Sequence, residues 1–379
     1  MVTLQQVMRE GFPVYARSRC LPLHVHAAAR ALVDCGTAAM GGHAWACPDG
    51  HEMRVAYNGC RHRSCPRCAG RRNEAWLAER SARLLPCEHY HAIFTVPHEL
   101  EALWFADRRC MVDLLFGSVR ATLLELLDDE RYLGARPGVI ATLHTWGRTL
   151  SFHPHIHCLI TGGGWSASGW KMVRNGHLLP FRVVQKLFRG KLLAALRQAL
   201  ARDRLTLPSG WSRERVESLL RLVGEKKWNV HLRERYEHGR GVLAYLGRYL
   251  RGGPLRDHQL VALTEEAVVF RYTDHRDGEK KLLALPLEHF VQRLTWHVPE
   301  PWQHGVRYWG LYARDQAATL EAARSVVMPP SSGDIERAAS LARAPHPAPA
   351  ELLCTTCGRA LVEVATWGRG REPPRGLLH

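Results

Sequence analysis

Cysteines are concentrated in the N-terminal part of this chain, where five of the eleven lie between Cys35 and Cys68. Two residues separate Cys65 from Cys68, and three separate Cys47 from His51. Zinc binds thiolate and imidazole ligands in a tetrahedron, which two such pairs can supply. Buried free thiols are the alternative, but pairs at ligand spacing in so short a span favour the metal. The sequence predicts one structural zinc ion held by four of Cys47, His51, Cys60, Cys65 and Cys68, with Cys35 as an outlying candidate.

The basic composition narrows the class of partner. Lysine and arginine together number 52 against 36 acidic residues, which gives a net charge of +16 at pH 7. A field of that sign attracts polyanions, so nucleic acid is the first partner to expect and an anionic membrane surface the second. Arg61, Arg63 and Arg67 lie among the clustered cysteines. We expect them to contact DNA phosphates, with a solvated arginine face as the plainer alternative.

Targeting signals are not evident along the chain. Arginines interrupt the opening residues, and no later stretch has the charge-free length that a membrane helix needs. We therefore expect a cytoplasmic protein without a membrane partner, whose thiols stay reduced.

A histidine-rich stretch, His153-Pro154-His155-Ile156-His157, is the second strong feature. Side chains two apart project from the same face of a strand, so His155 and His157 point together while Ile156 points to the core. Their Cα atoms are expected to lie roughly 6.6 Å apart, which lets two imidazoles converge on one ion. His144 is the expected third ligand if a hairpin pairs it near His153. The alternative is a histidine-rich surface strand.

The segment Tyr245-Leu246-Gly247-Arg248-Tyr249 places two tyrosines one helical turn apart. Tyrosine is a weak nucleophile at its ordinary pKa of about 10, but a metal that polarises a phosphate lowers the barrier to its attack. Two tyrosines allow two successive covalent links to phosphate. Arg248 and Arg251 are suited to hold the phosphates. Such a pair more often packs in a core, and only the upstream histidines in a basic chain favour catalysis.

Periodicity along the chain predicts an α+β protein. Helices are expected over residues 1–35, 71–85, 99–127, 183–202, 213–223, 242–246 and 287–294. Strands are expected over 92–96, 139–144, 150–160 and 268–272, with the middle two forming a hairpin. We expect an N-terminal helical and zinc-binding domain over 1–90, a larger domain over 91–325, and a Pro-, Ser- and Ala-rich tail over 326–379. Cys354 and Cys357 in that tail are either half a zinc site or two idle thiols.

The order of these motifs resembles that of transposases of the insertion-sequence-91 family, members of the histidine-hydrophobe-histidine (HUH) endonuclease superfamily. The matching stretches, within residues 30–315, are Cys60–Cys68, Phe94–Pro97, His144–Gly147, His153–His157 with Gly162–Gly164, and Tyr245–Tyr249. The resemblance implies that the zinc-binding domain is followed by an HUH nuclease domain with a central antiparallel sheet flanked by helices. It also implies that His155 and His157 hold Mg²⁺ or Mn²⁺. The chain departs from the family at Cys47 and His51, where a second cysteine is common, and at Gly252-Gly253-Pro254.

Membership of this family implies a two-tyrosine DNA transposase. Tyr245 and Tyr249 would attack single-stranded DNA at the element ends and target, leaving a 5′-phosphotyrosine and a free 3′-hydroxyl, and would drive rolling-circle transposition. No Gly-x4-Gly-Lys loop is present, which argues against an attached helicase. The alternatives are a plasmid or phage rolling-circle replication initiator, a non-catalytic zinc-ribbon DNA-binding protein, and a metal-dependent phosphoesterase with structural tyrosines.

Overall fold

The computed structural model describes residues 2–68, 83–236, 253–274, 276–327, 352–372 and 374. The chain forms two compact units, each assembled from separated stretches of sequence. The first takes residues 1–72, 255–295 and 330–379, and the second takes 73–254 and 296–329. Helices and antiparallel sheets in both units confirm the α+β class. Residues 255–295 and 330–379 group with the N-terminal region in the first unit.

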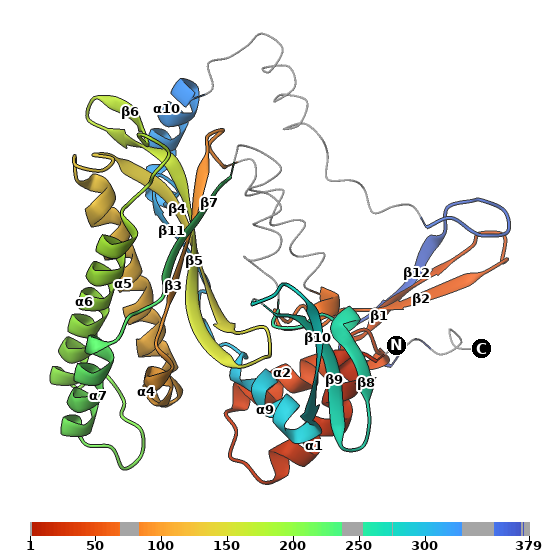
Figure 1. The fold of residues 1–379 in the computed structure, drawn as a ribbon. Coiled ribbons are helices and arrows are strands. Elements are labelled where there is room, and N and C mark those ends of the chain that lie inside the picture. Colours follow the sequence, from red (N-terminus) through yellow and green to blue (C-terminus); the bar gives the residue numbers. More distant parts are fainter. Residues whose placement is uncertain are drawn as a thin grey trace. The chain divides into compact units, whose positions relative to one another are not determined.

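The second unit is built on an antiparallel sheet with a layer of helices on one face (Figure 1). Among the described residues this sheet has the strand order β11-β4-β5-β3-β7, and β6 pairs with the end of β5. Its strands are β3 (His89–Thr95), β4 (Arg136–Trp146), β5 (Phe152–Ser166), β6 (Gly169–Met172), β7 (Val230–Tyr236) and β11 (Val306–Gly310). The hairpin predicted from residues 139–160 is the β4–β5 pair at the centre of this sheet.

Helices α4 (Glu101–Ala106), α5 (Arg108–Asp128), α6 (Phe181–Ala201) and α7 (Arg213–Glu225) cover that face of the sheet (Figure 1). The helix expected over 99–127 is divided at Asp107, whose carboxylate accepts the Cys110 N–H at 3.0 Å and so caps α5. The core beneath the helices includes Phe94 and Ile156 from the strands and Phe188 from α6. Burying each of these side chains stabilises the fold by about 1.5–3 kcal/mol.

The opposite face of the sheet carries a smaller core. Ile140 and Leu159 of the sheet pack there with Leu320 of α10 (Ala317–Val327). Because alternate residues of a strand face opposite sides, the odd-numbered positions 155, 157 and 159 of β5 share this face, and Ile156 faces the helix layer. The short helices η2 (His98–Leu100) and η5 (Arg314–Gln316) complete the second unit.

Among its described residues, the first unit combines three α-helices with two small sheets. The helix expected over residues 1–35 is two helices, α1 (Leu4–Arg17) and α2 (Leu23–Asp34), separated by a break that includes Pro22. A Cβ added at Gly11 would lie 2.8 Å from side-chain atoms of Leu287 and Val291, so glycine permits close packing of α1 on α9 (Leu287–Trp296). One sheet has the order β10-β9-β8, formed by β8 (Leu260–Leu263), β9 (Ala267–Thr273) and β10 (Lys280–Pro286).

The other sheet of the first unit joins distant parts of the chain. Strands β1 (Gly42–Ala46) and β2 (Met53–Tyr57) pair as a hairpin, and β12 (Val362–Trp367) pairs with the free edge of β1. Short helices η1 (Ala38–Met40) and η4 (Asp257–Gln259) link neighbouring elements. Residues 71–82 and 242–246 of the expected helices lie outside the described residues. Within the described part of the chain, no helix has the length and apolar character needed to cross a membrane.

Candidate active site and metal centres

Three histidines gather on the paired strands β4 and β5, on the face of the sheet opposite the helix layer. His144 pairs directly with His155. The ring centroid of His144 lies 5.5 Å from that of His155 and 4.6 Å from that of His157. One ring nitrogen of each of the three lies within 4.8 Å of the others. The sequence made His144 the third candidate on the condition that it pairs near His153; in the structure it pairs with His155, two residues further on, and His153 is exposed and outside this group.

Hydrogen bonds determine which nitrogen of each imidazole is available to an ion. The Nδ1 atom of His155 lies 2.6 Å from the backbone carbonyl oxygen of His153. Because a carbonyl only accepts, this Nδ1 carries the proton and Nε2 keeps its lone pair. The Nδ1 atom of His157 lies 2.9 Å from Nε2 of His91, and the two rings are stacked. With Nδ1 facing His91, Nε2 is the nitrogen through which His157 would bind an ion.

Burial favours the uncharged form of His155 and His157. Burial, followed by repulsion from His144, lowers the pKa of His155 to about 3 and holds the pKa of His157 well below its ordinary value. A neutral imidazole offers its lone pair at neutral pH, so no proton has to leave when an ion binds. Three imidazoles leave the remaining coordination positions for water or a phosphate oxygen. The donor set thus fits a divalent cation, although imidazole ligands do not by themselves select Mg²⁺.

His91 is a site residue that the sequence analysis missed. It lies on β3 with 6% of its surface exposed, and β3 pairs with β5. The segment His89-Tyr90-His91 has the same alternation as His155-Ile156-His157, and this was the available signal. Alternation alone does not predict that His91 contacts His157, because this contact depends on which strand pairs with β5.

The expected nucleophiles Tyr245 and Tyr249, together with Arg248 and Arg251, lie in residues 237–252, outside the described part of the chain.

The clustered cysteines divide into two groups where the sequence predicted one. The first group is Cys35, Cys60, Cys65 and Cys68. The Sγ atom of Cys35 lies 3.5 Å from the Sγ atoms of both Cys65 and Cys68, and those of Cys60 and Cys68 are 3.8 Å apart. Thiolates bound 2.3 Å from one tetrahedral zinc ion would be about 3.8 Å apart, so this group fits a zinc site with four cysteine ligands.

Cys35, the outlying candidate, completes the first group because α2 ends at Asp34 and places Cys35 beside the loop of Cys60. Cys47 and His51 belong to the second group, together with Cys354 and Cys357. Strand pairing explains the division, since β12 brings the C-terminal cysteines to the end of β1.

The three arginines of the cysteine loop are all exposed. Arg67 also has a structural contact, because its Nη1 donates to the backbone carbonyl oxygen of Cys35 at 3.1 Å. Arg61 has a left-handed backbone (φ 54°), and its N–H donates to the Sγ of Cys68 at 3.3 Å. Arg61 and Arg63 are exposed at the surface of this loop.

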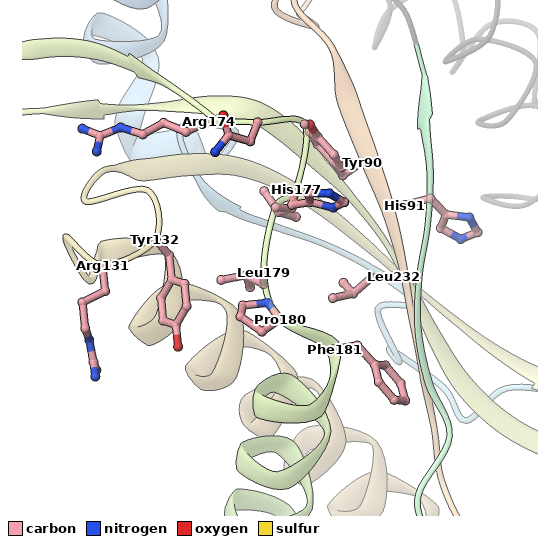
Figure 2. Close-up of a pocket in the computed structure, with 13 residues that line it drawn as sticks. Tyr90, His91, Arg131, Tyr132, Arg174, His177, Leu179, Pro180, Phe181 and Leu232 are labelled. Atoms are coloured by element: carbon pink, nitrogen blue, oxygen red, sulfur yellow. The ribbon is translucent and has the colours of Figure 1, made fainter.

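A cleft of about 780 Å³ lies in the second unit. Figure 2 shows Arg131 and Tyr132, which follow α5, and Arg174 and His177, which lie between β6 and α6, around this cleft. Tyr90 and His91 of β3 also line it. Arginine and tyrosine side chains around one hollow are suited to a nucleic acid strand, because they offer charge for phosphates and rings for stacking.

Comparisons with known proteins agree on one family. Residues 7–96 match a family model described as "Transposase zinc-binding domain", and residues 138–319 match one described as "Putative transposase". The "Putative transposase y4qJ" of Sinorhizobium fredii is 35% identical over 287 residues, which cover 74% of this chain and 72% of that protein. The "Transposase for insertion sequence element IS801" of Pseudomonas savastanoi pv. phaseolicola is 31% identical over 291 residues, covering 74% of this chain and 68% of that protein.

Among solved structures, a conjugative relaxase in complex with oriT DNA covers 59% of this chain and 93% of its own at 15% identity. Its TM-score of 0.24 is too low to show a shared fold. The family assignment rests on the two family models and the two relatives. A transposase zinc-binding domain precedes a transposase domain in one chain, and each relative is similar to about three quarters of this chain. The chain belongs to the insertion-sequence-91 family of transposases.

Proposed function

We propose that this transposase cuts and rejoins single-stranded DNA by metal-assisted transesterification at tyrosine, and that this reaction drives rolling-circle transposition. The observation that supports the proposal most is the group of three histidines on β4 and β5, in which one ring nitrogen of each lies within 4.8 Å of the others. A set of ligands with open coordination positions is suited to a reacting phosphate, whereas a structural site has all its positions filled by the protein.

In this proposal His144, His155 and His157 hold Mg²⁺ or Mn²⁺, the two ions that the family resemblance implies. When bound, such an ion supplies Lewis-acid polarisation of the scissile phosphate. His155 and His157 offer Nε2, because their Nδ1 atoms are engaged by the His153 carbonyl oxygen and by His91. His91 is then a positioning residue that holds the His157 ring in one orientation.

The proposed nucleophile is the hydroxyl oxygen of Tyr245 or Tyr249. This oxygen forms a bond to phosphorus while the bond from phosphorus to the 3′-oxygen breaks. The 3′-oxygen leaves with the electron pair and ends as a hydroxyl, and solvent carries the proton that the phenol loses. One phosphodiester bond replaces another, so rejoining needs no external energy source. The second tyrosine acts in the same way on the other DNA end, and Arg248 and Arg251 hold the phosphates.

Binding of the DNA strand is assigned to two regions. The cleft lined by Arg131, Tyr132 and Arg174 is suited to hold phosphates and stacked bases of an unpaired strand. Arg61 and Arg63 on the zinc-binding loop would contact further phosphates. Because the substrate is bacterial DNA, we expect the protein to act in the cytoplasm, at the nucleoid.

Covalent capture of DNA tests this function. The full chain is incubated with Mn²⁺ and end-labelled single strands that carry the element's own ends, and a denaturing gel resolves the protein–DNA adduct. We expect an adduct that a chelator abolishes, and that disappears in the Tyr245→Phe/Tyr249→Phe and His155→Ala/His157→Ala variants. Tyr57→Phe and His258→Ala change exposed residues outside the proposed site and should keep the adduct. Binding of genuine ends without any adduct would rule out the catalytic proposal.

A further inference from the structure

We infer that Cys47, His51, Cys354 and Cys357 bind a second structural zinc ion, which fastens the C-terminal end of the chain to the N-terminal zinc-binding region. This site lies beyond the proposed catalytic function and does not depend on it. The matched zinc-binding domain ends at residue 96, so it contains only two of the four ligands.

Strand pairing places the four ligands at the ends of neighbouring turns. Ala46, the last residue of β1, pairs with Val362 of β12. Cys47 and His51 lie in the turn between β1 and β2, and Cys354 and Cys357 lie in the turn that precedes β12. Two metal-binding turns brought side by side by a shared sheet form a zinc ribbon.

The two turns have matching backbone geometry. The N–H of Cys47 donates to the carbonyl oxygen of Glu52 at 2.9 Å, and the N–H of Cys354 donates to that of Arg359 at 2.8 Å. Each turn also contains a glycine in the left-handed region, Gly50 with φ 76° and Gly358 with φ 72°. In both turns, therefore, the backbone folds back so that two ligand side chains point to the same side.

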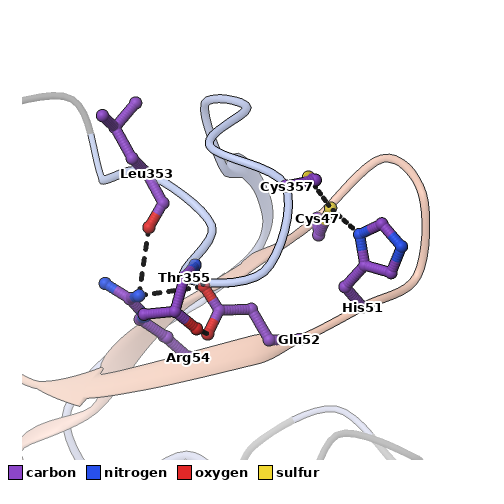
Figure 3. Close-up of polar contacts among 7 residues, drawn as sticks. All are labelled: Cys47, His51, Glu52, Arg54, Leu353, Thr355 and Cys357. Carbon is purple, nitrogen blue, oxygen red and sulfur yellow. Dashed lines mark hydrogen bonds and ion pairs between the residues drawn. The ribbon is translucent and has the colours of Figure 1, made fainter.

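Distances between the ligand atoms agree with a shared ion. The Sγ atom of Cys47 lies 3.5 Å from Nδ1 of His51 and 3.6 Å from Sγ of Cys357 (Figure 3). Zinc at 2.3 Å from sulfur and 2.0–2.1 Å from nitrogen, with tetrahedral angles, would give about 3.6 and about 3.8 Å. All four ligand atoms lie within 4.8 Å of one another. A disulfide is excluded for Cys47 and Cys357, because bonded sulfurs would be about 2.05 Å apart.

Polar contacts hold the second turn in place without using the ligands. Glu52 accepts hydrogen bonds from both the N–H and the hydroxyl of Thr355, each at 2.8 Å. Arg54 donates to the carbonyl oxygen of Leu353 at 3.0 Å (Figure 3). Arg359 pairs with Asp49 of the first turn. None of these contacts uses a ligand atom, and the four ligand atoms lie within 4.8 Å of one another.

A zinc ion would add to the modest apolar core of this small sheet. Cys47, Cys354 and Leu361 form a small buried cluster beside the ligands, with Trp45 partly buried against them, and Ala44 and Trp367 are buried elsewhere in the sheet. Val362 and Val364 of β12 remain 54% and 52% exposed. Sheets this small are commonly stabilised by a metal in place of a hydrophobic core. The sulfurs of Cys47 and Cys357 are 310 residues apart in sequence, and cross-links over long loops remove the most chain entropy.

Zinc content of the purified full chain tests the inference. All of these measurements use chains that also carry His155→Ala/His157→Ala, which removes the candidate histidine site for a divalent cation. Elemental analysis should give two zinc ions per chain in that background, and one when either Cys354→Ser/Cys357→Ser or Cys60→Ser/Cys65→Ser is added. Cys20→Ser/Cys110→Ser changes two cysteines outside both groups and should keep two. Two zinc ions retained after Cys354→Ser/Cys357→Ser, or only one in the background chain, would overturn the inference.

A second measurement does not depend on losing a ligand. With Co²⁺ in place of zinc, His51→Cys converts a three-sulfur, one-nitrogen site into a four-sulfur site, so the ligand-field absorption should move to longer wavelength while the metal content stays at two. An unshifted spectrum would show that His51 is not a ligand and would overturn the assignment.

Discussion

The contact between His91 and His157 allows a quantitative test of the histidine cluster. His91→Phe keeps a planar ring and removes the nitrogen that lies 2.9 Å from Nδ1 of His157. The His157 side chain, only 4% exposed, then loses the partner that orients it. Removing such a partner of a metal ligand lowers metal affinity by about 10- to 100-fold, or about 1.4–2.8 kcal/mol. The buried N–H left without an acceptor should also lower the free energy of unfolding by about 1–3 kcal/mol.

Titration calorimetry with Mn²⁺ measures the affinity, and adduct formation against Mn²⁺ concentration should show rescue by excess metal. His91→Gln should restore part of the affinity, because its amide oxygen can accept the His157 N–H. His89→Phe is the matched control: His89 is 1% exposed on the same strand and contacts the Tyr312 hydroxyl at 2.8 Å. It should lose stability but keep its Mn²⁺ affinity. Equal losses of Mn²⁺ affinity in His89→Phe and His91→Phe would refute the positioning role.

Three further predictions concern stability. Burial lowers the pKa of His297 to about 4, below the ordinary value of about 6.5. The neutral ring therefore contributes its whole share to the free energy of unfolding above pH 6.5. Acidification removes that contribution, by about 2 kcal/mol at pH 5. In urea unfolding at pH 7.5 and 5, His297→Gln should lose that difference, and an unchanged pH dependence would contradict the reasoning. A Cβ at Gly310 (φ 57°) would lie 1.8 Å from the Pro137 carbonyl oxygen, so Gly310→Ala should destabilise the protein by more than about 2 kcal/mol. A Cβ at Gly190 of α6 would meet no atom within 4 Å, so Gly190→Ala should stabilise the protein by about 0.5–1 kcal/mol. Equal melting temperatures for the two variants would contradict this. Removing zinc with a chelator should abolish hydrogen-exchange protection in β1, β2 and β12 but leave α5 and α6 protected, and uniform loss would count against two independent units.

Local sequence patterns predicted the elements that carry their own signal. Helices α5, α6 and α7 have long apolar periodicity, and the β4–β5 hairpin has continuous apolar strands. Local patterns did not predict β7 and β11, which lie at the two ends of the described strand order in the central sheet. The sequence of β7, residues 230–236, contains three consecutive charged residues and so lacks the apolar alternation that predicts a strand. Its strand conformation accompanies its pairing with β3. Pairing of that kind is decided by tertiary contacts and not by local propensity.

The same distinction applies to the sites. The sequence by itself determined which residues close together in the chain can bind one metal ion. Local backbone geometry alone places His155 and His157 on the same face of a strand, and Cys65 and Cys68 on the same side of a turn. Only the tertiary structure decided which further residues join these candidate sites. The register of the β4–β5 hairpin brings in His144, and the pairing of β3 with β5 brings in His91. The end of α2 places Cys35 in its group, and the pairing of β12 with β1 places Cys354 and Cys357 in theirs. His91 and His157 are 66 residues apart, and Cys47 and Cys357 are 310 apart. No local periodicity encodes contacts over such separations, because they arise when burial and strand hydrogen bonding select one register for the whole sheet.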